Sequence, residues 1–392
     1  MTRPTILAYY FPNWHHDEEN SARYDGGWNE WQLLKKAQPR YAGHRQPRIP
    51  AAGYVDEADP SAMAIEIDLA ADHGVDAFEF DFYWYKDGPF LAKALDQGYL
   101  GAPNRSRIQF ALMWANHDWL DIFPASHTHN DCLKRGAVNR ETFDAMTDHI
   151  IAHYFSQQEY LRIDGRPFFS VYEIGSLVLG LGGVQAARDA LRSFEQKTIA
   201  AGHPGLYLDT VVWGFGVLPT ALTTTNPTDL ITELGFRSAS SYVWIHHTDI
   251  NTHAFPRGDW DRVAADAAAA YEGYSETLPV PFIPNVTVGW DASPRTAQDE
   301  PFTADTYPWY PTFDSEPAQF EQGLRSVKRL LERQNLEHPM LTLNAWNEWT
   351  EGSAILPDTV HGKGYLEAIK TVFGVQPSSL IAANRNTGAD EV

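Results

Sequence analysis

The sequence contains one cysteine, Cys132, among 392 residues. A single cysteine excludes an intramolecular disulfide and any metal or redox site built from several cysteines. No apolar run approaches the roughly 18 residues that a membrane-spanning helix needs. The N-terminal residues lead directly into an apolar strand-like run and lack the basic start and cleavage site of a secretory signal peptide. We therefore expect a cytoplasmic protein that does not act at a membrane.

Basic residues are scarce, because 30 Lys and Arg stand against 51 Asp and Glu, for a net charge of −21. A surface this acidic repels phosphate backbones, which disfavours nucleic acid as a partner. Aromatic residues are abundant, with 13 Trp, 18 Tyr and 20 Phe. Some of them will fill the core, but flat aromatic rings also stack against the C–H faces of sugars. The composition therefore favours a glycan as the ligand.

Several catalytic and cofactor motifs are missing. No G-x-G-x-x-G or G-x-x-x-x-G-K-[ST] loop follows a strand-like run, which argues against a nucleotide-binding sheet. No G-x-S-x-G elbow is present. The histidine pairs His15/His16, His127/His129 and His246/His247 lack the spacing of an H-E-x-x-H zinc site. We expect neither a metal nor another cofactor.

Short apolar runs alternate with amphipathic stretches along the chain. This alternation predicts parallel strands joined by helices, and eight strands favour an α/β fold of the (β/α)8 TIM-barrel type. We expect one catalytic barrel over residues 1–375 and a polar, loosely ordered tail over residues 376–392. The predicted strands are Thr5–Tyr10, Val75–Tyr83, Ile108–Trp114, Phe168–Tyr172, Tyr207–Trp213, one within Leu230–Trp244, Phe282–Val288 and Met340–Ala345. The predicted helices are Pro60–His73, Arg140–Tyr154, Val184–Ala201, Asp259–Thr277, Pro317–Asn335 and Gly362–Phe373.

Three connections are long, namely Phe11–Asp59, Ala115–Asn139 and Gly289–Glu316. Each follows a strand, so we expect all three at the C-terminal end of the barrel, where barrel enzymes carry their active sites. Long loops in compact domains are usually functional or disordered. Their content of Trp, His, Asp and Asn favours a functional role.

The densest polar cluster closes the eighth strand, over Asn344–Gly352. It contains Glu348 and Glu351, a spacing that on most chains is only the charged face of a helix. Here the two residues lie between Trp and Asn, directly after a buried strand and before Gly352. Glycoside hydrolysis needs two carboxyl groups at the anomeric carbon, one protonated and one ionised. Glu348 and Glu351 are therefore the candidate catalytic pair.

Aromatic and hydrogen-bonding side chains recur at nearly every predicted strand end, as a polyhydroxylated ligand requires. A hydrogen-bonded rim network without a ligand is the alternative for each cluster. The candidate substrate-binding residues are Tyr9, Tyr10, Trp28, Glu30, Trp31, His44, Gln46, Arg48, Asp81, Tyr83, Trp84, Trp114, Asn116, His117, Asp118, Trp119, Tyr172, Glu173, Trp213, Tyr242, Trp244, Trp290, Asp291, Arg295, Asn344, Trp346, Asn347 and Trp349.

The chain resembles the glycoside hydrolase family 99-like group, which includes endo-α-mannosidases and WbsX-type proteins of polysaccharide gene clusters. The resemblance extends from about residue 7 to residue 367, and the last of its motifs is specific. The matching stretches are Ala8–Pro12, Trp28–Trp31, Gly43–Pro50, Trp114–Trp119, Gly289–Asp291 with Pro294 and Arg295, and Trp346–Gly352.

The resemblance implies a (β/α)8 barrel and cleavage with retention of configuration. Glu348 would deprotonate the 2-hydroxyl of the sugar, and Glu351 would protonate the leaving oxygen. The sugar's own O2 would then attack C1 and give a 1,2-anhydro sugar, which requires a 1,2-trans bond such as that of an α-mannoside. One departure is Asn116-His117-Asp118-Trp119, where WbsX-type relatives often have Asn-Glu-Asn-Trp, and it affects the expected substrate contacts.

The leading interpretation is thus a retaining, endo-acting α-mannosidase acting on a mannose-containing oligo- or polysaccharide. A second is a WbsX-type enzyme of polysaccharide assembly or turnover that acts on another 1,2-trans sugar, such as an α-L-rhamnoside, or as a transferase. A third is a glycan-binding barrel without catalytic activity. Linkage, endo or exo action and oligomeric state stay open.

Overall fold

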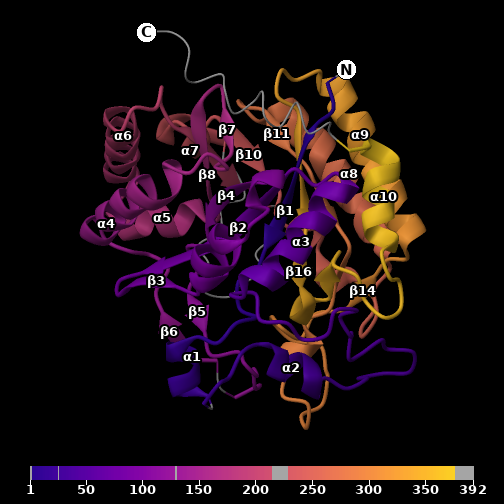
Figure 1. Cartoon of the computed structure of the whole chain (residues 1–392). Coiled ribbons are helices and arrows are strands. Elements are labelled where there is room, and N and C mark those ends of the chain that lie inside the picture. The colour runs from indigo at the N-terminus through magenta and orange to yellow at the C-terminus, as the bar shows by residue number, and fades with distance from the viewer. Residues whose placement is uncertain (1, 25, 129, 214–227, 376–392) are drawn as a thin grey trace.

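A computed structural model of the chain describes residues 2–24, 26–128, 130–213 and 228–375 (Figure 1). Its centre is a ring of parallel strands, as the sequence predicts. The tail predicted over residues 376–392 lies outside the described residues. In ring order the strands are β1 (Thr5–Tyr10), β2 (Ala77–Tyr85), β4 (Gln109–Trp114), β8 (Arg166–Val171), β9 (Tyr207–Val211), β10 (Ser238–Ser240), β11 (Phe282–Ile283) with β12 (Asn285–Thr287), and β15 (Met340–Asn344).

The seventh strand is divided at Pro284, and this division closes the ring. Its first half, β11, pairs with β10, and its second half, β12, pairs with β15. Proline lacks the N–H that a continuous ladder would use. The backbone N–H of Ser241 donates to Ile283 at 3.0 Å, and that of Thr342 donates to Pro284 at 2.9 Å. The TIM-barrel fold class is therefore confirmed, although the single strand predicted over Phe282–Val288 is two short ones.

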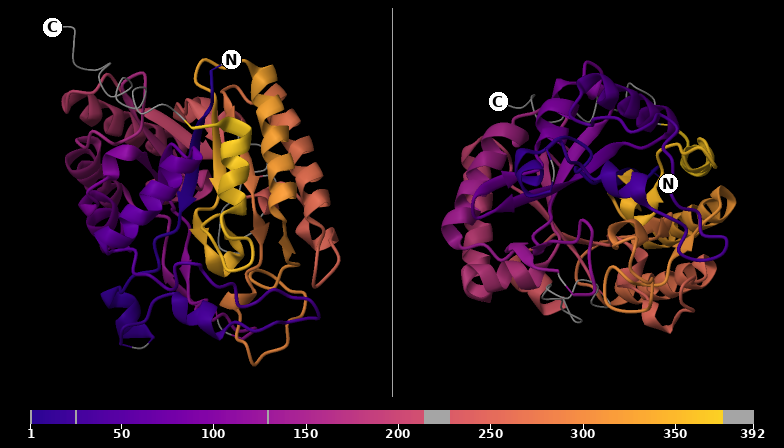
Figure 2. Two further views of the ribbon diagram at one scale, coloured as in Figure 1. Left: turned by 45° about the vertical axis from the view of Figure 1, so that its right-hand side comes forward. Right: turned by 90° about the horizontal axis from the view of Figure 1, so that it is seen from below.

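Helices surround the ring on the outside, which the view along the barrel shows (Figure 2, right). Asp59 caps α3 through the Ser61 N–H, and Gly74 ends it with φ +86°. The helix predicted over Arg140–Tyr154 consists of two parts. The α-helix ends at Ile150, and the π-helix η3 (Ile151–Phe155) continues it. The helices are α3 (Pro60–His73), α4 (Arg140–Ile150), α5 (Ile174–Leu181), α6 (Val184–Ala200), α7 (Thr228–Leu234), α8 (Trp260–Thr277), α9 (Pro317–Gln334) and α10 (Gly364–Phe373).

The length and polarity of the helices also bear on whether the chain could cross a membrane. Within the described residues, no helix combines the length and the apolar character that a membrane crossing would demand.

The three long connections lie at the C-terminal end of the strands, as predicted, which is the lower end in Figure 1. They fold into short elements that the sequence did not reveal: α1 (Glu18–Arg23), α2 (Trp31–Lys36), the pair β5 (Trp119–Leu120) and β6 (Cys132–Lys134), η6 (Ser293–Arg295), and the pair β13 (Gly289–Trp290) and β14 (Phe313–Asp314). The remaining short elements are β3 (Gly88–Phe90), β7 (Arg162–Ile163), η1 (Ala94–Tyr99), η2 (Arg105–Arg107), η4 (Trp244–His246), η5 (Ile250–Thr252), the pair β16 (Asn347–Glu348) and β17 (Ser353–Ala354), and η7 (Trp349–Glu351).

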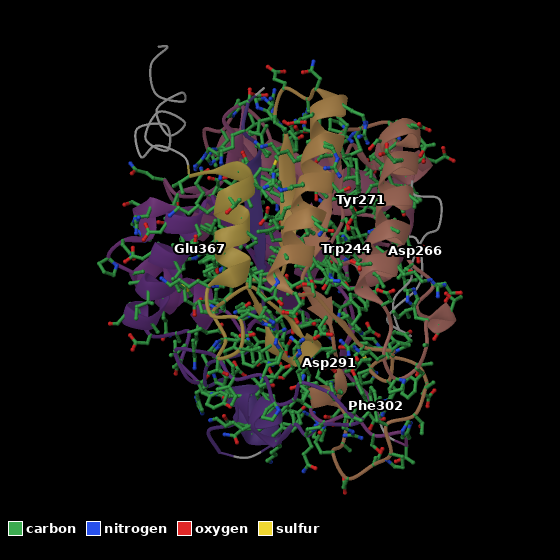
Figure 3. All side chains as sticks on the ribbon, turned by 90° about the vertical axis from the view of Figure 1, so that its right-hand side faces the viewer. Trp244, Asp266, Tyr271, Asp291, Phe302 and Glu367 are labelled. Atoms are coloured by element: carbon green, nitrogen blue, oxygen red, sulfur yellow. The ribbon has the colours of Figure 1, made fainter. Side chains whose placement is uncertain are left out.

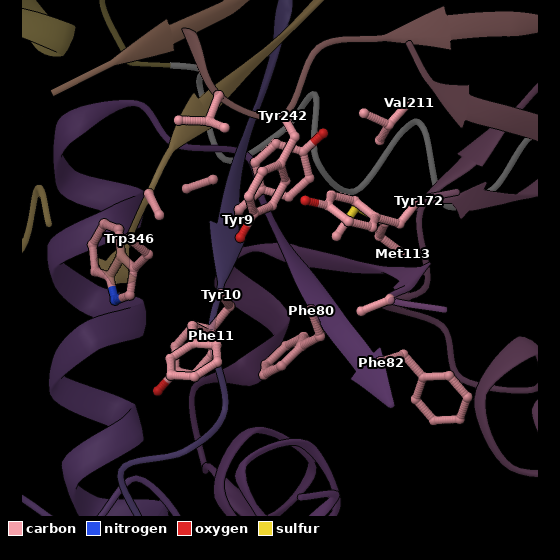
Figure 4. Close-up of a cluster of buried hydrophobic side chains, with 14 of the residues drawn as sticks. Tyr9, Tyr10, Phe11, Phe80, Phe82, Met113, Tyr172, Val211, Tyr242 and Trp346 are labelled. Carbon is pink, nitrogen blue, oxygen red and sulfur yellow. The ribbon is translucent and has the colours of Figure 1, made fainter. Parts of the chain in front are cut away.

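The barrel interior is layered. The layer at the N-terminal end is apolar and includes Leu7, Phe168 and Met340. The next layer is polar, and there Asp209 accepts hydrogen bonds from the hydroxyls of Ser170, Ser238 and Ser240 at 2.7, 2.6 and 2.6 Å. Next toward the C-terminal end lie aromatic rings, and Figure 4 shows Tyr9 beside Tyr242, whose ring packs against Tyr172. The layers fill the ring, so the space for a ligand lies beyond them at the C-terminal end.

Candidate active site

A cavity opens at the C-terminal end of the barrel. Its walls combine acidic and aromatic side chains from several strand ends and from all three long connections. The residues around it are Phe11, Asp81, Tyr83, Met113, Ala115, His117, Asp118, Trp119, Leu120, Ile122, Phe123, Tyr172, Tyr242, Val243, His246, Trp290, Arg295, Tyr307, Glu348 and Glu351.

Arg295 is the cation with which the carboxylates of this cavity form ion pairs. Its Nη2 donates to Glu348 at 2.7 Å, its Nε donates to Glu30 at 2.9 Å, and its Nη1 donates to Glu351. The guanidinium lies over the rings of Phe11 and Phe123, at 5.2 and 5.6 Å from their centroids. Because all three carboxylates and the guanidinium are buried, these ion pairs are shielded from water and from salt. One cation thus holds both candidate catalytic carboxylates in place.

Tyr307 adds a second donor to one member of the pair. Its hydroxyl donates to Glu351 at 2.7 Å and accepts from Arg295 Nη1 at 2.8 Å. Glu348 shares Arg295 but receives no hydrogen bond from Tyr307. The two glutamates therefore differ in the number of donors that support their ionised forms.

The local fold explains how two nearby glutamates reach one cavity. Glu348 ends β16, Glu351 lies in the 3-10 turn η7, and Gly352 reverses the chain with φ +68°. A Cβ at Gly352 would meet the Asp291 side chain at 2.7 Å. This turn therefore requires glycine, and the Glu-x-x-Glu-Gly spacing belongs to a tight turn and not to the charged face of a long helix.

Burial changes the protonation of the pair. It holds the pKa of Glu348 well above the usual glutamate value, and Arg295 offsets this only in part. Burial also raises the pKa of Glu351, with Arg295 and the Tyr307 hydroxyl opposing the rise. Two buried carboxyl groups around one guanidinium titrate together. The protonation of Glu348 and that of Glu351 therefore depend on each other.

The cavity floor and one wall carry further polar groups. The Tyr242 hydroxyl donates to Asp81 at 3.1 Å, and burial raises the pKa of Asp81 well above the usual aspartate value. Burial lowers the pKa of His117, whose Nδ1 lies 2.9 Å from the Asp118 carbonyl. A neutral imidazole and a protonated carboxyl can each donate to, and accept from, a sugar hydroxyl. Within the described residues, no three His, Cys, Asp or Glu side chains group closely enough to hold a metal ion.

The structure brings together both predicted catalytic residues and a subset of the predicted substrate-binding residues. Those that line the cavity are Asp81, Tyr83, His117, Asp118, Trp119, Tyr172, Tyr242, Trp290 and Arg295.

Other predicted residues lie one step behind the cavity and hold its walls. Glu30 binds Arg295, and Asn347 fixes Phe11 by hydrogen bonds to its backbone N–H and C=O at 2.8 and 2.9 Å. The side chain of Asn116 does the same for the backbone of Glu173, at 2.8 Å for both bonds.

A second supporting network lies behind the turn that carries Glu351. His44 and Gln46 contact the Asp291 carboxylate, both at 2.7 Å, and Arg48 donates to the Gly352 carbonyl at 2.6 Å. Figure 3 shows Asp291 below the ends of the outer helices, whereas Trp244 lies at their level.

The remaining predicted residues are buried in the packing and do not line the cavity. Trp346, for example, donates from Nε1 to Glu66 of α3 at 2.8 Å and is drawn beside a helix in Figure 4. The other members of this set are Tyr9, Tyr10, Trp28, Trp31, Trp84, Trp114, Trp213, Trp244, Asn344 and Trp349.

The sequence interpretation missed several lining residues. Tyr307 could have been found, because Tyr307-Pro308-Trp309-Tyr310 is an aromatic run in the third long connection. The apolar members carry no signal that separates them from core residues. The lining residues missed were Phe11, Met113, Ala115, Leu120, Ile122, Phe123, Val243, His246 and Tyr307.

Comparison with solved structures supports the barrel assignment. A protein described as glycoside hydrolase-like superposes with a TM-score of 0.61 at 14% identity, covering 96% of this chain and 95% of that one. The GH99 endo-α-mannosidase from Bacteroides thetaiotaomicron superposes with a TM-score of 0.55 at 12% identity, covering 98% and 99%. At these identities the likeness shows the fold.

Sequence comparison identifies the family. The protein WxcX of Xanthomonas campestris pv. campestris strain B100 is 28% identical over 388 residues, which cover 95% of this chain and 50% of WxcX. The chain thus spans about half the length of the curated relatives that it matches. The model of the family "Glycosyltransferase WbsX" matches residues 6–369. The chain therefore belongs to the WbsX glycosyltransferase family, with a barrel fold like that of glycoside hydrolases.

Proposed function

We propose that this protein is a retaining glycoside hydrolase that cleaves 1,2-trans glycosidic bonds. The substrate that we propose first is an α-mannosidic bond within a mannose-containing oligo- or polysaccharide. The observation that carries the proposal is the buried pair Glu348 and Glu351, held by Arg295 in a cavity with aromatic walls. Its chemistry is that of two carboxyl groups with unequal proton affinity in one cavity.

In the first step, Glu348 accepts the proton of the sugar 2-hydroxyl while O2 forms a bond to C1. The bond between C1 and the leaving oxygen breaks, and Glu351 gives its proton to that oxygen. The product on the enzyme is a 1,2-anhydro sugar, now facing an ionised Glu351 and a protonated Glu348. O2 must approach C1 opposite the leaving group, which restricts this reaction to 1,2-trans bonds.

In the second step, Glu351 takes a proton from water, and the water oxygen attacks C1. The bond between C1 and O2 breaks, and Glu348 returns its proton to O2. Two inversions at C1 give net retention, and both glutamates recover their starting states. The sugar's own O2 acts as the nucleophile, so the carboxyl separation that distinguishes ordinary retaining from inverting enzymes need not apply.

The hydrogen bonds within the protein favour the proton on Glu348, because Glu351 receives hydrogen bonds from both Arg295 and Tyr307. The proposed roles need the opposite arrangement when the first step begins. We infer that the proton moves within the pair on substrate binding, when the 2-hydroxyl becomes a new donor to Glu348. A hydrogen bond to the ionised form of a carboxyl group lowers its pKa.

Aryl α-mannosides with leaving groups of graded acidity test these roles. A good leaving group needs no protonation, so Glu351→Gln should keep much of the wild-type rate of aryl release in the first turnover on the most acidic phenol. Glu348→Gln should be slow on every substrate, because O2 still needs a base. The reverse pattern would exchange the two roles.

The substrate class and the anomeric configuration of the product are tested by offering α-mannan and α-L-rhamnan oligosaccharides and following the products by proton NMR. Retention appears as an α-anomer before mutarotation. Transfer to a second sugar, without new reducing ends, would replace hydrolysis by the transferase activity that the family's name suggests. Release of the β-anomer would contradict the anhydro-sugar route.

A further inference from the structure

A second pocket, which we call the lateral pocket, lies on the side of the barrel between α3 and the segments around residues 50–55 and 356–357. Asn347 and Trp349, on either side of the catalytic Glu348, form part of its wall. The lateral pocket therefore backs onto the segment that carries the active site but opens elsewhere.

Two buried acids lie in the wall of this pocket. Glu57 is 1% exposed, and its Oε1 accepts from the Trp14 backbone N–H at 2.7 Å and contacts His15 Nδ1 at 2.8 Å. Its Oε2 has no hydrogen-bond partner among the described residues. Glu66 is 7% exposed and accepts from Trp346 Nε1 at 2.8 Å. Burial raises the pKa of both acids, and that of Glu66 reaches about 7.

The rest of the wall is aromatic and aliphatic. The Trp14 and Trp31 rings lie 4.1 Å apart between centroids, and Trp31 lies 6.3 Å from Trp349. The buried Nε1 of Trp14 also lacks a partner among the described residues. At the mouth, Ile65 is 60% exposed. Aromatic faces attract cations strongly when water is excluded.

The charges around the lateral pocket are unbalanced. Lys363, at the N-terminal end of α10, is exposed at the rim, whereas Glu57 and Glu66 are buried. His15 pairs with Glu57 at 2.8 Å, and the Tyr10 hydroxyl lies near both acids, close enough to favour their ionised forms. Glu66, in contrast, has no cation beside it among the described residues, and a buried carboxylate without a cation is costly. A positively charged ligand would offset that cost.

We propose that the lateral pocket binds a small organic cation, an alkylammonium group carried on an apolar body. The apolar body would pack between the tryptophan rings and Ile65, and the ammonium group would face Glu66 and Glu57. The inference rests on this pocket alone and is independent of the reaction proposed for the main cavity.

Benzylammonium and benzyl alcohol test this proposal, because they share shape and differ in charge. Calorimetric titration at pH 8, above the pKa of Glu66, should show benzylammonium binding at least about tenfold more tightly, equal to 1.4 kcal/mol. Glu66→Gln keeps an acceptor for Trp346 and should remove most of this preference. Ile65→Trp should fill the mouth and weaken both probes, whereas Leu179→Trp, at another 60% exposed position on α5, should change neither.

The main cavity is also acidic, so a cation bound there must be distinguished. Glu348→Gln should leave the benzylammonium preference unchanged if the lateral pocket is the site. The proposal is overturned if the probes bind equally, if neither binds, if the preference survives Glu66→Gln, or if Glu348→Gln removes it.

Discussion

Buried carboxyl groups lie at two levels of the barrel, and the two sets differ in the partners that surround them. At the C-terminal end, Glu30, Glu348 and Glu351 all contact Arg295. Deeper in the barrel, beyond the aromatic layer, Asp209 accepts three serine hydroxyls, and neither oxygen of Glu79 has a partner among the described residues. The same residue types therefore form ion pairs where a guanidinium is present, and they accept hydroxyl hydrogen bonds or lie without a partner among the described residues where none is.

The largest effect should come from removing the shared cation. Arg295→Met leaves three buried carboxylates without a counter-ion, which costs about 3–5 kcal/mol of unfolding free energy and should abolish measurable turnover. Urea unfolding and substrate cleavage check the two effects. Arg45→Met is the control, because Arg45 and its partner Glu316 are 42% and 53% exposed and such surface pairs contribute about 0–1 kcal/mol. Equal losses in both variants would refute the central role of Arg295.

Deeper in the barrel, Asp209→Leu should be costly. The change leaves the hydroxyls of Ser170, Ser238 and Ser240 without their acceptor. Each buried hydroxyl left unpaired costs about 1–3 kcal/mol, so the unfolding free energy should fall by several kcal/mol, measured by urea unfolding at pH 7. A variant as stable as the wild type would show that water already satisfies these hydroxyls.

Tyr307→Phe should have an intermediate effect and act on one glutamate only. It removes a donor to the ionised form of Glu351, so the pKa of Glu351 should rise further. If Glu351 is the acid, the basic limb of the pH–rate profile moves to higher pH. We expect kcat/KM to fall about tenfold, the size of one hydrogen bond to a charged group. An unchanged basic limb would mean that another group controls it.

Glu79→Met should have the smallest effect, and it should be stabilising. Burial, with Asp209 and Asp81 nearby, holds the pKa of Glu79 well above its usual value. A folded-state pKa above the unfolded one means that the folded state binds the proton more tightly. Stability is then lost as pH rises above the unfolded value, so the variant should gain about 1 kcal/mol or more over the wild type between pH 5 and pH 8. A variant less stable at pH 8 would indicate a hidden partner for Glu79.

The sequence predicted those parts of the fold that local signals specify. Thr5–Tyr10 and Pro60–His73 have the predicted limits, because an apolar run, a capping aspartate and a terminal glycine mark them. The sixth strand, Ser238–Ser240, reads Ser-Ala-Ser and has no apolar pattern. Its serines face Asp209 inside the barrel, so only the tertiary structure explains them.

In the candidate site, too, some features follow from local sequence signals and others only from the tertiary structure. Glu348 and Glu351 stand out because they are close in sequence and follow a buried strand. The sequence also singled out Arg295 and Glu30 as candidate substrate-binding residues, but it did not predict their ion pairs, since Arg295 lies 53 and 56 positions away from the two glutamates and 265 positions from Glu30. Counting aromatic residues at strand ends also predicted too many ligand contacts, because alternate residues of a barrel strand point outward into the helix layer.

The most direct test is the rate of Glu348→Gln and of Glu351→Gln on an unactivated glycan that the wild type cleaves, with affinity measured in parallel by calorimetry. Amide side chains keep the shape of the cavity but cannot exchange the proton. Each variant should lose about a thousandfold or more in kcat while binding the glycan within a few-fold of wild type. If either variant kept full turnover, that glutamate would not be catalytic, and if the wild type itself bound glycans without cleaving any, the barrel would be a binding protein.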